Sequence, residues 1–268
     1  MAEPVYAPVI VAAKAMFRTL GLSIHLEGTH NVPRSGGAVL ASNHVSYLDF
    51  IFAGYGAHPS RRYVRFMAKD SIWKNPVAGP LMRGMKHIPV DREAGAESFR
   101  VALEALKRGE VVGIFPEATI SRSFEVKDFK SGAPRLAMDA GVPLLPTILW
   151  GTQRLMTKGR ERDFSRGKAV SITVGEPIDV PPGSDLDAVG VQLHRTMETM
   201  LDDAIARYPQ RPSGPEDAWW MPARLGGTAP TLQEATRMDR TEALERARAH
   251  RQRAAQAASP DADGARDN

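Results

Sequence analysis

Short apolar runs alternate with helical patterns between residues 36 and 178. Six runs rich in Val, Ile, Leu and Ala predict strands, at 38–42, 63–68, 87–90, 111–115, 144–149 and 170–174. Apolar positions three and four residues apart predict helices at 49–55, 73–85, 97–107 and 134–140, and a later one at 185–208. This alternation is typical of an α/β fold in which helices flank a mixed, largely parallel sheet.

The two ends of the chain differ from this central pattern. Residues 1–22 predict an amphipathic helix that either covers the core or lies in a bilayer interface. Its apolar stripe comprises Val9, Ala13, Met16, Phe17 and Leu20. The predicted main domain covers 23–208 and is followed by an extension at 209–253 and a disordered tail at 254–268. In the extension, Trp219 and Trp220 either sit at a membrane interface or pack on the domain.

Composition narrows the possible chemistry. Of the 268 residues, 43% are hydrophobic and 25% charged, which favours a soluble globular protein over a disordered chain or a polytopic membrane protein. The chain has no cysteine, so disulfides, thiolate metal sites and cysteine nucleophiles are excluded. It also has no P-loop, G-x-G-x-x-G or H-E-x-x-H motif, so nucleotide-driven, dinucleotide-dependent and zinc-protease functions have no support.

Positive charge is concentrated in two stretches. Residues 61–92 contain eight basic and two acidic residues, and residues 154–168 contain six basic and two acidic ones. Each stretch is either a solvated surface or a binding surface for an anionic partner. A phosphorylated substrate, anionic lipid headgroups and nucleic acid all fit the second interpretation.

The most informative segment is NHVSYLD at 43–49, which follows a predicted buried strand and ends where a helix begins. His44 and Asp49 are five residues apart and can meet only if His44 lies in the turn. The carboxylate would then fix the imidazole tautomer, leaving the other ring nitrogen to take a proton from a substrate hydroxyl. The structural alternative is a histidine at the helix start and an aspartate in its favourable first turn.

Two more polar segments follow neighbouring strands. They are IPVDR at 88–92 and FPEATIS at 115–121, the latter followed by FKSG at 129–132. Open α/β sheets gather their ligands at such strand ends. Considered separately, Arg92 could be an ion-pair partner of Asp91, and Glu117 could cap the segment that starts at Thr119.

The order and spacing of these segments resemble the glycerolipid acyltransferase family, which includes 1-acyl-sn-glycerol-3-phosphate acyltransferases. NHVSYLD matches the family's NHxxxxD, IPVDR its block ending in arginine, FPEATIS its FPEGTRS, and VPLLP at 142–146 its proline-bearing strand. The resemblance extends over residues 21–178. It fails at two positions, where Ala118 replaces glycine and Ile120 replaces an arginine, whose charge Arg122 or Lys130 could supply.

The resemblance implies an acyltransferase fold and transfer of a fatty acyl group from acyl-CoA or acyl carrier protein to lysophosphatidate, giving phosphatidic acid. His44 would be the general base, and Asp49 would stabilise its imidazolium form. Six residues would bind substrate: Asn43, Arg92, Glu117, Thr119, Arg122 and Lys130. No cofactor or metal is expected, because the acyl thioester is itself a substrate.

The resemblance also implies peripheral attachment to the cytoplasmic face of the cell membrane, with anionic lipid and not nucleic acid as the partner. One alternative is an acyltransferase for another lysophospholipid or a glycolipid. A second is a serine thioesterase or lipase, for which the G-x-S-x-G elbow is missing. A third is a non-catalytic basic module that binds membrane or nucleic acid, which explains the charge but not the ordered polar segments.

Overall fold

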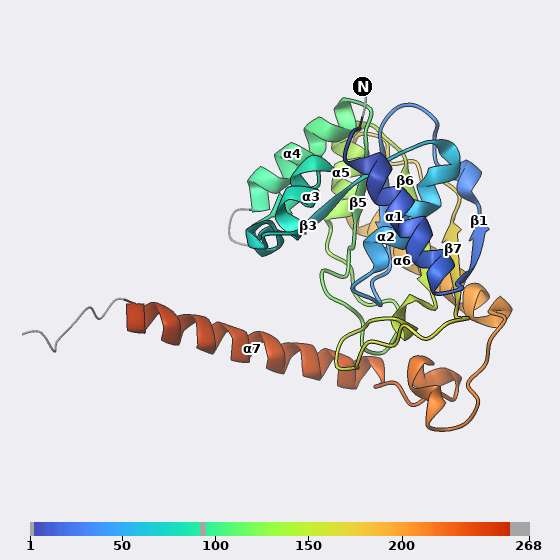
Figure 1. Cartoon of the computed structure of the whole chain (residues 1–268). Coiled ribbons are helices and arrows are strands. Elements are labelled where there is room, and N and C mark those ends of the chain that lie inside the picture. The colour runs from blue at the N-terminus through green and yellow to red at the C-terminus, as the bar shows by residue number, and fades with distance from the viewer. Residues whose placement is uncertain (1–2, 92–94, 258–268) are drawn as a thin grey trace, which may run out of the picture.

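The computed structural model describes residues 3–91 and 95–257, apart from the side chains of residues 250 and 253–257. Within these ranges seven strands form one sheet, with helices on both of its faces (Figure 1). The strands are β1 (Ser23–Glu27), β2 (Ala38–Ser42), β3 (Val64–Lys69), β4 (Ile88–Val90), β5 (Val111–Ile114), β6 (Leu144–Trp150) and β7 (Ala169–Val174).

The helices of the described residues alternate with these strands up to β7. The α-helices are α1 (Tyr6–Thr19), α2 (Asp49–Ala57), α3 (Ala78–Gly84), α4 (Gly95–Lys107), α5 (Gly132–Ala140), α6 (Leu186–Arg207) and α7 (Leu232–Ala257). Short 3₁₀ helices are η1 (Thr29–Asn31), η2 (His58–Ser60), η3 (Asp70–Lys74), η4 (Thr152–Arg154), η5 (Asp217–Trp220) and η6 (Ala223–Leu225).

The sheet has the order β1-β7-β6-β2-β5-β3-β4, so β2 is its central strand. All neighbouring strands are parallel except β6 and β7, which run antiparallel. The predicted mixed, largely parallel sheet is therefore confirmed. Because parallel strands end at the same edge, the loops after β2, β5 and β6 are brought together there.

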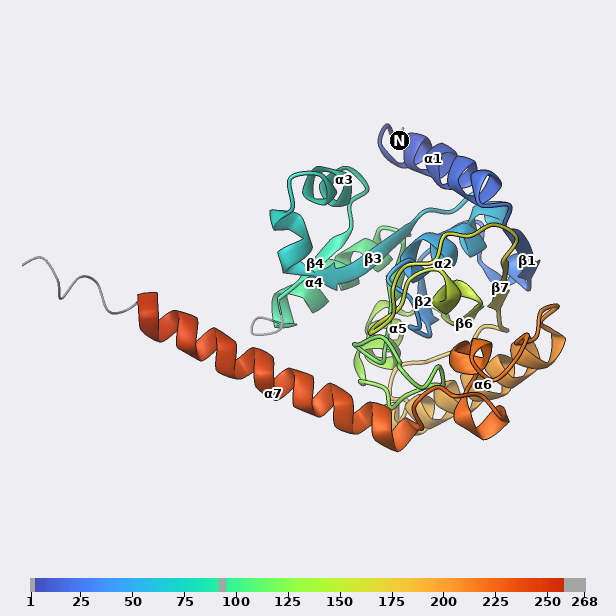
Figure 2. The ribbon, with the colours of Figure 1, turned by 60° about the horizontal axis from the view of Figure 1, so that its bottom comes forward.

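Two apolar layers cover the sheet. On β2, Val39 and Ala41 pack against the layer formed with α4, α5 and α6, whereas Ala38 and Leu40 pack against the layer of α1 and α2 (Figure 2). Every residue of β2 is fully buried, as expected for a central parallel strand. Three residues of the apolar stripe, Ala13, Met16 and Phe17, belong to the second layer, where Phe17 stacks on Phe52 of α2 with ring centroids 4.9 Å apart. This face of α1 therefore covers the core.

Two segments differ from the sequence pattern, and a third decides between two alternatives that the pattern left open. β1 was not predicted, because its alternation of Ser23, His25 and Glu27 belongs to an exposed edge strand. The predicted helix at 73–85 is split into η3 and α3, since Asn75 accepts hydrogen bonds from the first backbone N–H groups of α3. Trp220 is fully buried against Trp150, so it packs on the domain.

α7 begins at a capping box and extends away from the rest of the molecule (Figures 1 and 2). The Thr231 hydroxyl accepts from the N–H of Glu234, and the Glu234 carboxylate accepts from the Thr231 N–H, which satisfies donors at the helix start. The helix continues to Ala257, so it includes the first four residues of the predicted disordered tail. The remainder, 258–268, lies outside the described residues.

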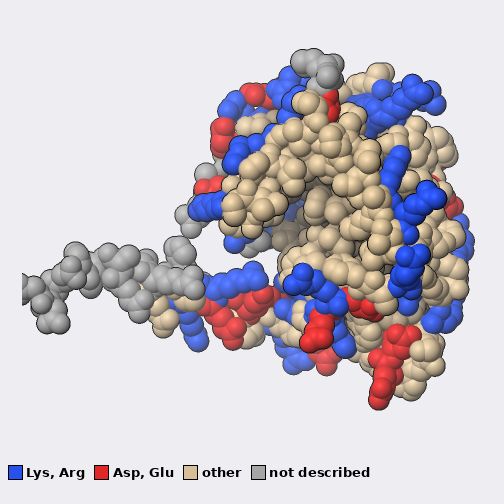
Figure 3. All heavy atoms as spheres, viewed as in Figure 1, with Lys and Arg blue, Asp and Glu red and all other residues tan. Residues whose placement is uncertain are grey.

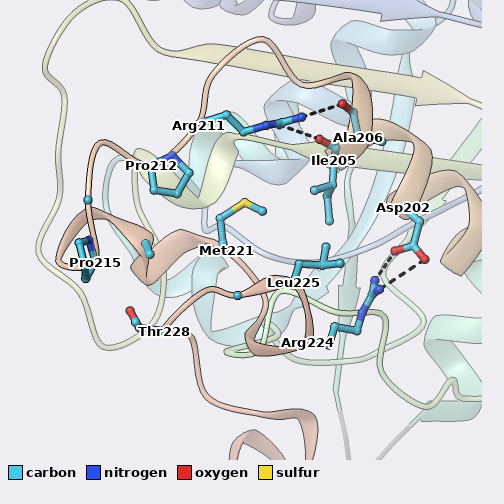
Figure 4. A pocket seen from close by; sticks show the side chains of 13 residues that line it. Asp202, Ile205, Ala206, Arg211, Pro212, Pro215, Met221, Arg224, Leu225 and Thr228 are labelled. Atoms are coloured by element: carbon cyan, nitrogen blue, oxygen red, sulfur yellow. Dashed lines mark hydrogen bonds and ion pairs between the residues drawn. The ribbon is translucent and has the colours of Figure 1, made fainter.

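A pocket of about 680 Å³ lies between the end of α6 and residues 211–228 (Figure 4). Its two arginines already have partners: Arg211 donates to carbonyl groups at the end of α6, and Arg224 pairs with Asp202 and Glu125. Among the described residues, none of the polar segments found in the sequence contributes to its lining. The polar segments after β2 and β5 lie together at the edge of the sheet.

Candidate active site

The parallel register of β2 and β5 places their following loops side by side. Ala41 pairs with Ile114, and His44 and Glu117 each follow three residues later. The His44 backbone N–H donates to Glu117 Oε1 at 3.0 Å, and the Ser121 N–H donates to the His44 carbonyl at 2.7 Å. The segments NHVSYLD and FPEATIS thus contact each other directly.

His44 and Asp49 form a hydrogen-bonded pair across the turn between β2 and α2. His44 Nδ1 lies 2.9 Å from Asp49 Oδ2. Asp49 is fully buried, whereas the His44 side chain is 20% exposed. Within the described ranges, Nε2 of His44 has no hydrogen-bond partner. The geometry therefore fixes Nδ1 on the carboxylate and leaves Nε2 available to a substrate.

The Asp49 carboxylate is held by three further donors. Oδ2 also accepts from the backbone N–H groups of Val45 and Ser46, both at 2.7 Å, and Oδ1 accepts from the Thr152 hydroxyl at 2.7 Å. Asp49 is also the first residue of α2, where the helix dipole favours a negative charge. These contacts stabilise a buried carboxylate and fix the direction in which it faces His44.

Asn43 anchors the start of the same turn to β6. Its Nδ2 donates to the Leu149 carbonyl at 3.0 Å, and its Oδ1 accepts from the Leu149 N–H at 2.7 Å. The Thr157 hydroxyl donates to the Val45 carbonyl at 2.7 Å. The amide of Asn43 is thus engaged with the backbone of β6, which places this residue in a positioning role, and its predicted contact with substrate stays a prediction.

A row of aromatic rings lies beneath the imidazole. The His44 ring stacks on Phe115, with centroids 4.2 Å apart and planes 22° apart. Phe115 in turn stacks on Phe66 of β3, at 5.8 Å and 14°. Together with the bond to Asp49, this packing restricts the imidazole to one orientation and keeps water from one of its faces.

Glu117 is a buried carboxyl group beside this turn. Burial raises the pKa of Glu117 well above its usual value, and the His44 N–H and the nearby charge of Lys127 offset this only in part. Its Oε2 is buried and has no hydrogen-bond partner within the described ranges. Glu117 therefore supports the His44 backbone with one oxygen and has a second one that could bind a substrate group.

The other predicted substrate-binding residues lie in different surroundings. The Thr119 hydroxyl accepts from Lys158 Nζ at 2.8 Å, and Arg122 pairs with Glu242 of α7 at 3.2 Å. Lys130 is exposed, and its backbone N–H donates to the Pro116 carbonyl. Arg92 lies outside the described residues. The binding roles of these four residues stay predictions.

The two departures from the family pattern have clear local structures. Ala118 has a φ of 57°, in the left-handed region that favours glycine, which gives a physical reason for the family's usual glycine there. Ile120 is 4% exposed, so its side chain is packed inside the protein where the family has an arginine. A cation that binds an anion at this place must come from another part of the chain.

Several contact residues were not singled out from the sequence. Thr152 holds Asp49. Lys127 contacts Asp239 of α7, and Lys158 donates to the Thr119 hydroxyl. Lys158 belongs to the basic stretch at 154–168, but nothing in that stretch distinguishes it from its neighbours. Thr152 and Lys127 carry no local signal, because their partners are distant in sequence.

Residues 3–91 and 95–257 contain neither a membrane-spanning helix nor a metal-binding group. No helix there is long and apolar enough to cross a bilayer. The same residues contain no group of three or more His, Asp or Glu side chains placed to hold a metal ion. The pair of His44 and Asp49 is an imidazole–carboxylate arrangement able to remove a proton from a hydroxyl group.

Comparisons with known proteins agree with this chemistry. A family model described as Acyltransferase matches residues 23–150. Over 149 residues the chain is 34% identical to the 1-acyl-sn-glycerol-3-phosphate acyltransferase of Bacillus subtilis, covering 55% of this chain and 70% of that protein. A chloroplast 1-acyl-sn-glycerol-3-phosphate acyltransferase of Arabidopsis thaliana is 33% identical over 159 residues, 58% of this chain and 43% of that one.

A solved structure is also similar. The crystal structure of the 1-acyl-sn-glycerophosphate acyltransferase from Thermotoga maritima aligns with a TM-score of 0.65 and 26% sequence identity. The alignment covers 76% of this chain and 81% of that one. The likeness therefore extends over about three quarters of this chain and is not confined to short motifs.

Proposed function

Because the chain belongs to the 1-acyl-sn-glycerol-3-phosphate acyltransferase family, we propose that it transfers a fatty acyl group from an acyl thioester to the free hydroxyl of lysophosphatidate, making phosphatidic acid. The donor is acyl-CoA or acyl carrier protein, and the reaction needs no other cofactor. The observation that carries the proposal is the 2.9 Å bond from His44 Nδ1 to Asp49 Oδ2, with Nε2 facing away from the carboxylate.

In the proposed mechanism His44 is the general base. Nε2 takes the proton from the acceptor hydroxyl as its oxygen attacks the thioester carbonyl carbon. The new carbon–oxygen bond forms, the carbon–sulfur bond breaks, and the leaving thiolate receives the proton from the imidazolium. Asp49 stabilises the imidazolium between these two proton transfers. The acyl group passes directly to the acceptor, so no covalent enzyme intermediate is required.

The long acyl chains of both substrates require a site that opens toward a bilayer. The surface formed by η3 and α3 exposes Ile72, Val77 and Leu81 together with Lys74 and Arg83, a combination that suits an anionic membrane. We propose that this surface holds the protein peripherally on the cytoplasmic face of the membrane. Within the same basic stretch, Arg62 and Arg65 are engaged inside the protein.

The membrane proposal is tested by flotation with vesicles that contain anionic lipid. The variant Val77→Asp places a negative charge at a side chain that is 72% exposed, so it should lower the bound fraction without unfolding the protein. Val191→Asp is the matched control, because Val191 is 54% exposed on α6. Equal binding of both variants and the wild type would contradict the assigned surface.

The activity is tested with purified protein, labelled palmitoyl-CoA or palmitoyl carrier protein, and a panel of lysolipids. The expected product is phosphatidic acid, formed only when lysophosphatidate is present. His44→Ala should lower turnover by at least about 10²-fold, the usual contribution of a positioned base. It should fold normally, since its side chain is partly exposed.

Other outcomes would identify the alternatives. Release of free fatty acid at the same rate with and without an acceptor would indicate a thioesterase. Faster transfer to another lysophospholipid or to a glycolipid would keep the mechanism and change the acceptor. If His44→Ala retained near-normal transfer, the base assignment would be wrong.

A further inference from the structure

Three basic side chains converge beside the FPEATIS segment. They are Arg122, Lys127 and Lys158, which we call the cation cluster. Their side chains are only 16%, 12% and 10% exposed, which is unusual for Lys and Arg unless they have anionic partners. Three largely buried positive charges at one place require compensation by negative ones.

That compensation comes from two carboxylates of α7. Asp239 Oδ1 lies 3.2 Å from Lys158 Nζ and 3.5 Å from Arg122 Nε, and its Oδ2 contacts Lys127 Nζ. Glu242 Oε2 lies 3.1 Å from Lys158 Nζ and 3.2 Å from Arg122 Nη2. Three carboxylate oxygens therefore occupy the cluster, the same number of acceptor oxygens as on a phosphate monoester.

The cation cluster adjoins the catalytic turn. Lys158 Nζ donates to the Thr119 hydroxyl at 2.8 Å, and Thr119 lies between Glu117 and Ser121, which both contact the His44 backbone. From the other side, Lys158 directly follows Thr157, whose hydroxyl binds the Val45 carbonyl. The cluster is therefore joined to the His44 turn through both of its neighbouring loops.

The cluster also compensates for a residue that the chain lacks. Ile120 is buried where the family has an arginine, so the FPEATIS turn itself offers no cation to a phosphate. The cation cluster stands beside this turn and carries one more positive charge than the two α7 carboxylates supply negative ones. Such a site retains an attraction for anions even when it is occupied.

α7 has little else to hold it in place. Beyond the fully buried Ala235, most of its described side chains are exposed, including Met238 at 43% and Leu244 at 60%. In Figure 3 acidic and basic side chains lie side by side along this helix, and the neighbouring face of the molecule is hollowed. Moving α7 away would therefore uncover little apolar surface and would mainly break the contacts of Asp239 and Glu242.

We propose that the cation cluster binds the phosphate of the acceptor, and that Asp239 and Glu242 occupy it as an internal anion until that phosphate displaces them. The proposal rests on the function assigned above and extends it, since it adds Lys127 and Lys158 to the acceptor site. It also gives the C-terminal helix a role as a competitor of the substrate. The chemistry recognised is a phosphomonoester attached to a lipid.

The first test removes the competing charges with little change of shape, in the full-length double variant Asp239→Asn/Glu242→Gln. The apparent affinity of a site is proportional to the fraction of molecules in which it is open, so a site that is closed about nine-tenths of the time predicts a fall of about tenfold in acceptor KM when it is opened. The KM for the acyl donor should not change. Glu245→Gln, on an exposed face of the same helix, is the control and should behave as wild type.

The second test weakens the cluster itself. Lys158→Met keeps the length of the side chain and removes a charge-assisted donor, so it should raise acceptor KM by about ten- to a hundredfold. The donor KM should again stay constant. An equal rise in both KM values would show that Lys158 only supports the fold, and this would contradict the proposal.

A third measurement does not depend on turnover. Calorimetric titration with inorganic phosphate should show tighter binding to the double variant than to wild type, and weaker binding to Lys158→Met. If the wild type makes phosphatidic acid but the double variant has unchanged acceptor KM and phosphate affinity, α7 is only a structural support and the proposal is wrong. If no lysophosphatidate is acylated, the proposed function fails, and the phosphate titration still decides whether the cluster binds anions.

Discussion

Asp49→Asn is the sharpest test of the catalytic pair, because an amide has nearly the shape of a carboxylate. Its oxygen can accept the bonds now made by His44 Nδ1 and by the N–H groups of Val45 and Ser46. Its NH₂ group can donate to the Thr152 hydroxyl, which is able to accept as well as donate. The turn should keep its structure while the negative charge beside the imidazole is lost.

The size of the effect follows from the distance between the two groups. His44 Nδ1 and Asp49 Oδ2 are 2.9 Å apart. Charge centres about 4 Å apart attract each other by about 4 kcal/mol at an effective dielectric constant of about 20. Because about 1.4 kcal/mol corresponds to a factor of ten in rate, the variant should lose about 10³-fold in kcat. Its melting temperature should change little.

Initial rates of labelled phosphatidic acid formation and a thermal melt of the same sample measure both effects. Asp49→Ala is the informative contrast, since it leaves the buried N–H groups of Val45 and Ser46 without an acceptor at about 1–3 kcal/mol each. It should therefore lose stability as well as activity. Activity of Asp49→Asn within tenfold of wild type would refute the role of the charge, and a large fall in its melting temperature would refute the structural reasoning.

Two further predictions concern the FPEATIS turn. Ala118→Gly should stabilise the protein by about 1 kcal/mol, a rise of about 2–4 °C in melting temperature, because Ala118 has a left-handed backbone; an unchanged or lower melting temperature would contradict this. Glu117→Gln should gain stability over wild type as the pH rises above the usual pKa of a glutamate carboxyl group, because burial raises the pKa of Glu117 in the folded state and the wild type therefore loses stability there. If the melting temperatures of Glu117→Gln and wild type differ by the same amount at every pH, burial does not raise the pKa of Glu117.

The sequence predicted the strands whose residues form apolar runs and are also buried at the centre of the sheet. β2 and β5 are continuous apolar runs, and each is followed by a polar segment, so both the central sheet and the meeting of His44 with Glu117 were accessible. The edge strand β1 was not, because its mostly polar, exposed residues give no apolar signal. The helix predicted at 73–85 failed where the side chain of Asn75 competes for the backbone and starts α3 anew.

The sequence predicted the catalytic pair of the candidate site but not the distant residues that hold it. His44 and Asp49 are five residues apart, so their pairing follows from one turn. Thr152 reaches Asp49 across 103 positions and Glu242 reaches Arg122 across 120, and no local pattern encodes such contacts. The cation cluster shows the same limit, since charge counting locates the basic stretch that contains Lys158 and cannot show that carboxylates of a distant helix pair with it.

The stacked rings beneath the imidazole connect its orientation to the packing inside the sheet. On β5, Gly113 has no side chain, and a Cβ at this position would collide with the ring of Phe66. Because Phe66 stacks on Phe115 and Phe115 on His44, a larger residue at this position would disturb the packing that orients the imidazole. A glycine with no side chain of its own is thus part of the packing on which the orientation of the catalytic imidazole depends.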